Sequence, residues 1–158
     1  MPVQPDGRYF CSSDEVHVQA EIVELADKAN KEHGFQIKRG ANDKSCVLRS
    51  GYVSLAVTWH QPILNRVTDH GSDKCSLNVT EFSGTVLMPG ELGFVIEQPN
   101  VLKRHSFKVG ISDTLELIWK ESGKKEILTA TNLSDRIFRI FLDLISRDNK
   151  GKISRPFI

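Results

Sequence analysis

Apolar residues recur every three or four positions near both ends of the chain and every second position between them. The first helical stripe, spaced four, three and four residues apart, consists of Val18, Ile22, Leu25 and Ala29. Such spacing marks one face of an α-helix. Ser12 followed by Glu15 fits a capping box, and Gly34 is a typical helix end. The sequence therefore predicts a helix over 13–33.

Between residues 35 and 128 the apolar period falls to two, which is typical of strands with one buried face. The clearest example alternates Val53, Leu55, Val57 and Trp59 with smaller or polar residues. Glycine, proline and asparagine separate the alternating segments. We expect about six to eight strands, with the first over 35–38, a turn over 40–43 and a further strand over 85–88.

The helical period returns near the C-terminus. One broad apolar face is formed by Leu133, Ile137, Ile140, Phe141, Leu144 and Ile145. Asn132 or Ser134 is suited to cap the start of this helix, and the segment Asn149 to Gly151 is suited to end it. We expect this helix to be more buried than the first one.

The order of elements predicts an α+β fold. It consists of an N-terminal helix, a mostly antiparallel curved sheet, and a C-terminal helix packed on the concave side of that sheet. We expect a flexible arm over 1–12, a single domain over 13–149 and a short basic tail over 150–158. This architecture resembles the helix-grip and TATA-binding-protein-like folds, and an architecture alone does not determine a function.

Charge is distributed unevenly although the net charge is only +1. Residues 1–99 carry nine basic and thirteen acidic side chains, whereas residues 100–158 carry twelve basic and seven acidic ones. We interpret the acids of the first helix as a solvated face: Asp14, Glu15, Glu21, Glu24, Asp27 and Glu32. With 158 residues and 39% hydrophobic residues, the chain is long enough to bury a core without stabilisation by a disulfide or a metal.

Three cysteines are widely separated and form no paired motif: Cys11, Cys46 and Cys75. Their odd number favours free thiols and a reducing, cytoplasmic location. The first ten residues lack the apolar stretch of a secretory signal, and no apolar run approaches the roughly 20 residues of a membrane span. We therefore expect no membrane association.

Catalytic motifs are absent from the sequence, and we predict no catalytic residue and no cofactor. The most suggestive polar cluster consists of His60, Asp69, His70 and Asp73. These residue types can bind a metal, but their spacing matches no known zinc pattern. We interpret the segment as an ordinary polar loop, and a metal-dependent enzyme stays an alternative. His105 shares a strand face with Phe107 and is expected at the edge of the core.

The leading hypothesis is a non-catalytic interaction module that binds another macromolecule, most simply a protein. It would use the sheet edge, the wet sheet face or the basic C-terminal region. The candidate residues are Lys103, Arg104, Lys124 and Lys125, which a strand and a turn hold. The same cations could instead protect a sheet edge from aggregation. Nucleic acid is possible but not favoured, because no basic-aromatic pattern is present, and an apolar ligand cavity is a second alternative.

Overall fold

The computed structural model describes residues 8–42, 44–60, 75–91, 93, 98–114 and 116–153. Within these ranges the chain forms two helices and seven strands. In order, they are α1 (Arg8–His33), β1 (Lys38–Ala41), β2 (Ser45–Ser50), β3 (Val53–His60), β4 (Ser76–Ser83), β5 (Asn100–Ile111), β6 (Leu117–Glu121), β7 (Ile127–Leu128) and α2 (Ala130–Asn149). This order confirms the predicted α+β class.

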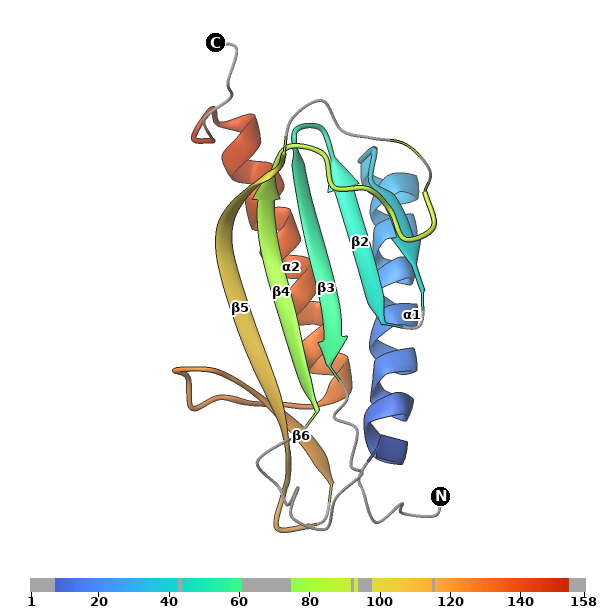
Figure 1. Ribbon diagram of the computed structural model, residues 1–158, viewed down its shortest axis with the longest axis vertical. Coiled ribbons are helices and arrows are strands. Elements are labelled where there is room, and N and C mark those ends of the chain that lie inside the picture. Colours follow the sequence, from blue (N-terminus) through green and yellow to red (C-terminus); the bar gives the residue numbers. More distant parts are fainter. Residues whose placement is uncertain are drawn as a thin grey trace.

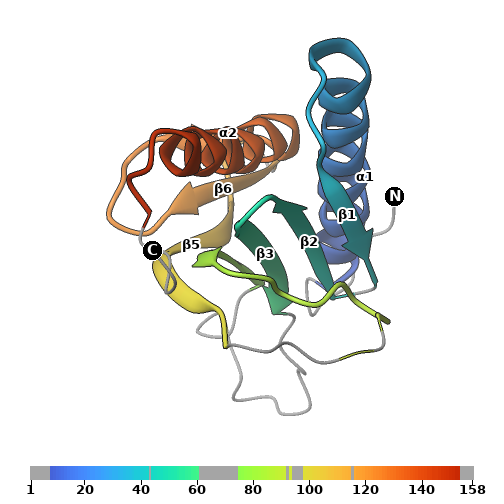
Figure 2. The same cartoon turned by 90° about the horizontal axis from the view of Figure 1, so that it is seen from above.

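The seven strands form one antiparallel sheet in which each strand pairs with its neighbours in the sequence. The sheet is curled, and α2 packs on its concave side while α1 lies beside α2 and β1 (Figures 1 and 2). Short turns can join antiparallel neighbours, so an uninterrupted run of strands closes into this meander. The predicted curved sheet with helices on its concave side is confirmed.

Aromatic side chains fill the space between the sheet and α2. Trp59 and Trp119 meet edge to face with their ring centroids 5.6 Å apart. Phe107 from the sheet and Phe141 from α2 are fully buried beside them. The inward positions of β3 are the alternating residues that the sequence marked as apolar, so the predicted core is confirmed.

Both predicted helix starts are wrong. Helix α1 begins at Arg8, so Ser12 lies inside the helix and cannot cap it. The N-cap of α2 is Thr129, whose side chain accepts a hydrogen bond from the Asn132 N–H. Capping signals are short and recur by chance, so more than one residue near a helix start can fit them. The predicted helix ends at Gly34 and Gly151 are confirmed, and both glycines have positive φ.

The first strand starts later than predicted because a side chain of α1 forms hydrogen bonds with both backbone groups of Ile37. The Asn30 amide donates to the Ile37 carbonyl at 2.9 Å and accepts from the Ile37 N–H at 2.8 Å. Strand pairing therefore begins at Lys38. The turn follows Ala41, where the Asn42 side chain accepts from the N–H groups of Lys44 and Ser45.

The predicted strand over 85–88 is not formed. This segment crosses the outer face of the sheet, the face turned away from the helices. The Ser54 hydroxyl donates to the Gly84 carbonyl at 2.9 Å and accepts from the Val86 N–H at 3.3 Å. Arg49 also donates to the Val86 carbonyl at 3.2 Å. Side chains of the sheet thus replace a neighbouring strand as hydrogen-bond partners, which periodicity cannot reveal.

Two acids of α1 depart from the predicted solvated face. Glu15 is buried, and the Asp14 carboxylate accepts a hydrogen bond from the Trp119 indole N–H at 2.8 Å. These two acids of α1 therefore face the core instead of the solvent, and Asp14 supplies the polar partner that the buried indole needs.

The prediction of three free thiols is also wrong. Cys46 is free and buried, but Cys75 is disulfide-bonded. Burial raises the pKa of the Cys46 thiol to about 11, although the charge of Arg39 opposes that rise. The argument from the cysteines to a reducing compartment therefore fails. Neither described helix has the length and apolar character needed to cross a membrane.

Candidate functional site

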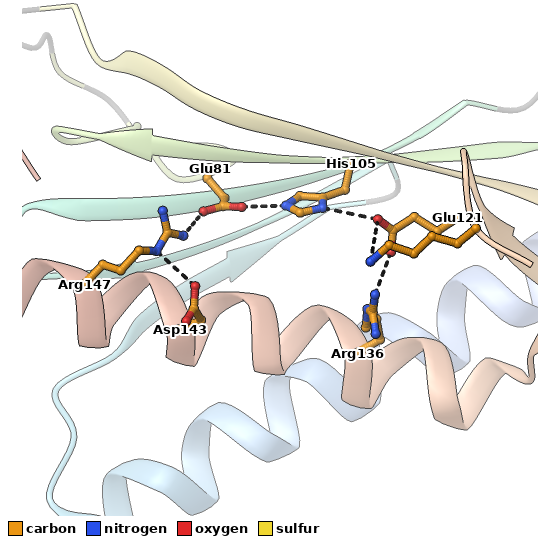
Figure 3. Close-up of polar contacts among 7 residues, drawn as sticks. Glu81, His105, Glu121, Arg136, Asp143 and Arg147 are labelled. Atoms are coloured by element: carbon orange, nitrogen blue, oxygen red, sulfur yellow. Dashed lines mark hydrogen bonds and ion pairs between the residues drawn. The ribbon is translucent and has the colours of Figure 1, made fainter. Parts of the chain in front are cut away.

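A chain of charged side chains lies between the sheet and α2 (Figure 3). Glu81 of β4, His105 of β5 and Glu121 of β6 all project toward the helix side, where their neighbours on each strand are core residues. The Nε2 atom of His105 lies 2.5 Å from the Glu81 carboxylate. Its Nδ1 atom lies 3.6 Å from the Glu121 carboxylate. The imidazole thus faces one carboxylate on each side.

Helix α2 supplies the cations that complete this cluster. Arg147 pairs with Glu81, and its Nε also donates to Asp143 one helical turn earlier at 2.9 Å. Arg136 donates to Glu121 at 3.1 Å. The arginines lie more than two turns apart, so the helix is attached to the sheet at two separate points.

Burial and charge act in opposite directions on the two carboxylates. Burial would raise the pKa of Glu81, but hydrogen bonds and charge from His105 and Arg147 outweigh it and hold the pKa below its ordinary value. Burial would likewise raise the pKa of Glu121, but the charges of Lys124 and Arg136 hold it below its ordinary value. Both acids are therefore ionised at neutral pH.

This arrangement is a connection between layers. The two acids that the sheet contributes, Glu81 and Glu121, are each paired with an arginine of α2. The side chains of Glu81 and His105 are only 2% and 8% exposed. The Glu121 side chain is 11% exposed, so it is slightly more accessible than its two neighbours. Buried ion pairs of this kind fix how elements pack and are costly to break.

Sequence reasoning found His105 but missed its partners. Glu81 follows Leu77 and Val79 in the same alternation, and Glu121 follows Trp119 two residues later. A charged residue in phase with an apolar strand face is a usable signal of a buried ion pair. The cation that pairs with Glu81 cannot be deduced from the sequence, because Arg147 lies 66 residues beyond Glu81.

The predicted metal cluster is only partly within the described residues. His60 ends β3 and is exposed, whereas Asp69, His70 and Asp73 lie outside the described residues. Among the residues that the structure describes, no group of three or more His, Cys, Asp or Glu side chains could hold a metal ion.

A cleft of about 460 Å³ lies between the two helices. Six of its seven lining residues are polar or charged, and they include Glu21, Glu24, Lys28 and Asp135. It is therefore different from the apolar cavity between sheet and terminal helix that a small-ligand protein would need, and that alternative stays a prediction.

The predicted cationic residues border one part of the sheet. Lys103 and Arg104 are consecutive on β5 and are exposed. Lys124 and Lys125 lie in the turn directly after β6, and Lys124 stands 3.6 Å from Glu121. This turn follows the last residue pair that joins β6 to β5, which is Glu121 with Phe107.

This part of the sheet is an open edge. Strand β4 pairs with β5 from Asn100 to Lys108, but β6 pairs with β5 only from Phe107 to Ile111. One further backbone bond joins the Ser122 N–H to the Ser106 carbonyl at 2.7 Å. No described strand covers the other side of residues 100–105, and Figure 1 shows the long β5 extending past the short β6. We call this segment the β5 edge.

Comparison of the chain with protein-family models, with curated proteins and with solved structures finds no match.

Proposed function

We propose that this protein is a non-catalytic interaction module that binds an extended, acidic segment of another protein at the β5 edge. The segment adds a strand to the sheet, as in other cases of peptide recognition by β-augmentation. The observation that carries this proposal is the uncovered backbone of residues 100–105.

Free backbone N–H and C=O groups of the β5 edge point toward the position that an added strand would occupy. Hydrogen bonds alternate along a strand, and Ser106 already bonds on the β6 side while Val109 bonds to Cys75 on the β4 side. The same alternation directs the N–H and C=O of Arg104 away from β4. These groups are the donors and acceptors that an incoming strand pairs with.

Two side chains of the β5 edge, Val101 and Leu102, differ from those of a protected edge. Val101 and Leu102 are 45% and 40% exposed, although protective edges place charges or proline at such positions. Exposed apolar side chains beside free backbone supply both parts of a strand-addition site, which are affinity from the main chain and specificity from the side chains.

Charge favours an acidic partner over a second copy of this chain. Neither Lys103 nor Arg104 forms an ion pair with any described residue, and Lys125 is also unpaired there. Two copies that paired through this edge would add a second set of cations to each face of the joined sheet, and like charges placed opposite each other destabilise a sheet. Acidic side chains on the added strand would neutralise them and would also speed association.

The test compares two variants with the same loss of charge. Arg104→Pro removes the outward N–H, which a sheet tolerates where that N–H faces solvent, and Arg104→Gln keeps it. The probe is a synthetic ten-residue peptide that alternates Glu with Val, and a Lys–Val peptide is its charge control. We expect the acidic peptide to slow amide exchange at Leu102 to His105, and Arg104→Pro to abolish binding while Arg104→Gln only weakens it.

Charge reversal provides an independent measurement. Changing Lys103, Arg104 and Lys125 together to Glu should leave the fold intact and flatten the salt dependence of peptide binding, whereas Lys124 is left unchanged because it pairs with Glu121. Equal binding of the acidic and basic peptides, or equal binding by the Pro and Gln variants, contradicts the proposal. A dimer in sedimentation that Arg104→Pro dissociates would instead identify the edge as a contact between copies.

A further inference from the structure

The outer face of the sheet carries a second, separate cationic surface. The register aligns four outward side chains across four strands, with His60 opposite Ser76, Ser76 opposite Lys108 and Lys108 opposite Lys120. We call this line of side chains the cationic row. His60, Lys108 and Lys120 are exposed.

A neutral hydrogen-bonding row lies beside the cationic row, two residues further along each strand. It consists of Thr58, Asn78 and Ser106, and the Ser106 hydroxyl donates to the Asn78 side chain at 3.0 Å. Taken together, the two rows cover about 14 Å across four strands, since neighbouring strands lie about 4.8 Å apart.

Acidic side chains are missing from this face of the described strands. The strands contain only two acids, Glu81 and Glu121, and both point toward the helices. The nearest acid before β6 is Glu116, which directly precedes the strand and lies four residues from Lys120. Neither Lys108 nor Lys120 forms an ion pair within the described part of the chain.

An external anion would relieve the repulsion between the two opposed lysines. Like charges directly across an antiparallel pair are unfavourable, and Lys108 and Lys120 are such a pair. Duplex nucleic acid presents about one negative charge per 1.7 Å of its axis, a density that suits two adjacent ammonium groups. Hydroxyl and amide groups like those of the neutral row are common partners of phosphate oxygens.

We propose that the cationic row binds the phosphate backbone of duplex nucleic acid without reading its sequence. None of the seven side chains in the two rows is a Phe, Tyr or Trp, and the single ring among them is the imidazole of His60 at one end of the cationic row, so successive unpaired bases have no platform on which to stack. The surface therefore favours a duplex over a single strand. It also lacks the large apolar side chains that insert into a lipid bilayer, which favours nucleic acid over a membrane.

This proposal is independent of the β5 edge, and its test leaves the edge unchanged. The probe is a labelled 20-base-pair DNA duplex of arbitrary sequence, titrated with the full chain at several salt concentrations. The variant is Lys108→Gln with Lys120→Gln. The control is Lys28→Gln with Lys31→Gln, which removes the same charge from exposed positions on α1.

We expect the wild-type chain and the α1 control to bind the duplex with the same steep salt dependence. The Lys108 and Lys120 variant should bind about tenfold more weakly at low salt, and its log–log salt slope should be smaller by about two. A second duplex of different sequence should bind equally well.

Three results would overturn the proposal. The first is wild-type binding no stronger than that of the Lys108 and Lys120 variant, and the second is equal weakening by the α1 control. The third is binding to vesicles with anionic lipids, lost in the Lys108 and Lys120 variant, without binding to the duplex, which would assign the row to lipid headgroups. The Glu–Val peptide used for the β5 edge tests whether the cationic row binds an acidic protein instead. If the Lys108 and Lys120 variant no longer binds this peptide, both surfaces serve one protein partner.

Discussion

At the scale of single residues, the most consequential side chain is Glu81. It is 2% exposed, accepts hydrogen bonds from two cationic or polar partners, and lies in a strand face that is otherwise apolar. Removing one member of such a cluster leaves the others buried without a counter-charge. The loss of stability on removing Glu81 therefore arises mostly from the groups that remain buried without a counter-charge, namely His105 and Arg147.

We predict that Glu81→Ala lowers the free energy of unfolding by about 3–5 kcal/mol. Urea unfolding followed by fluorescence measures this loss. The control is Asp135→Ala, which removes a 53% exposed acid paired with Arg139 on the surface of α2. That change should cost less than about 1 kcal/mol. Equal effects of the two substitutions would mean that the buried cluster contributes no more than a surface ion pair.

The two carboxylates of the cluster also predict how stability depends on pH. Glu81 and Glu121 have pKa values below their ordinary value of 4.5 in the folded protein. The unfolded chain therefore binds their protons at higher pH than the folded chain does. Their stabilising contribution is complete above pH 4.5 and is lost as the pH falls through the lowered pKa values.

Unfolding free energies measured from neutral pH into the acid range test this prediction. The wild-type chain should lose stability progressively below pH 4.5. A variant with Glu81→Gln and Glu121→Gln should start less stable and show a flatter dependence, because the titrating groups are gone. A variant with the same slope as the wild-type chain would show that other acids cause the loss.

At the scale of elements, α2 holds the structure together. Its inward residues include the fully buried Leu133, Ile137, Phe141 and Leu144, and its arginines reach the sheet at two points. Helix α1 contacts α2 and β1 and contributes Asp14 to the indole of Trp119. The sheet's concave side is thus covered by two helices that also contact each other (Figure 2).

We predict that Phe141→Ala lowers the free energy of unfolding by about 3–5 kcal/mol, because it opens a cavity where the ring is fully buried. Leu142→Ala is the control, since Leu142 lies next along the helix and is only partly buried. It should cost clearly less. Thermal and urea unfolding measure both losses, and an unchanged melting temperature for Phe141→Ala would contradict the placement of α2.

At the scale of the whole molecule, the two layers share one core. Trp59 and Trp119 contact each other, and residues from both helices and six strands belong to the same cluster. Charge is divided between surfaces, with acids concentrated on α1 and unpaired cations on the outer face and the β5 edge. This division gives the molecule an electrostatic polarity despite its net charge of +1.

A shared core predicts a single cooperative unfolding transition. Far-ultraviolet circular dichroism reports mainly on the two helices, whereas tryptophan fluorescence reports on the centre of the core. Both signals should change with the same midpoint and the same dependence on urea. A helical signal that persists after the tryptophans are exposed would show that α1 and α2 form a separate unit.

Local pattern was sufficient to predict the type of most elements and the composition of the core. The periods of apolar residues depend only on neighbouring positions, so Val18 to Ala29 and Val53 to Trp59 identified a helix and a strand correctly. Helix ends were equally local, because Gly34 and Gly151 adopt a positive φ that other residues rarely adopt. The order of these elements then limited the fold to an antiparallel sheet with terminal helices.

Tertiary structure alone decided where pairing stops and which charges meet. The β5 edge exists because β6 leaves β5 at Phe107, and nothing within residues 100–105 marks that event. The contact of Glu81 with Arg147 and the path of residues 84–88 over Ser54 likewise join parts of the chain that are far apart in sequence. Lys108 and Lys120 oppose each other only through the strand register. Each of these features depends on the distance between residues in space, which periodicity along the chain does not contain.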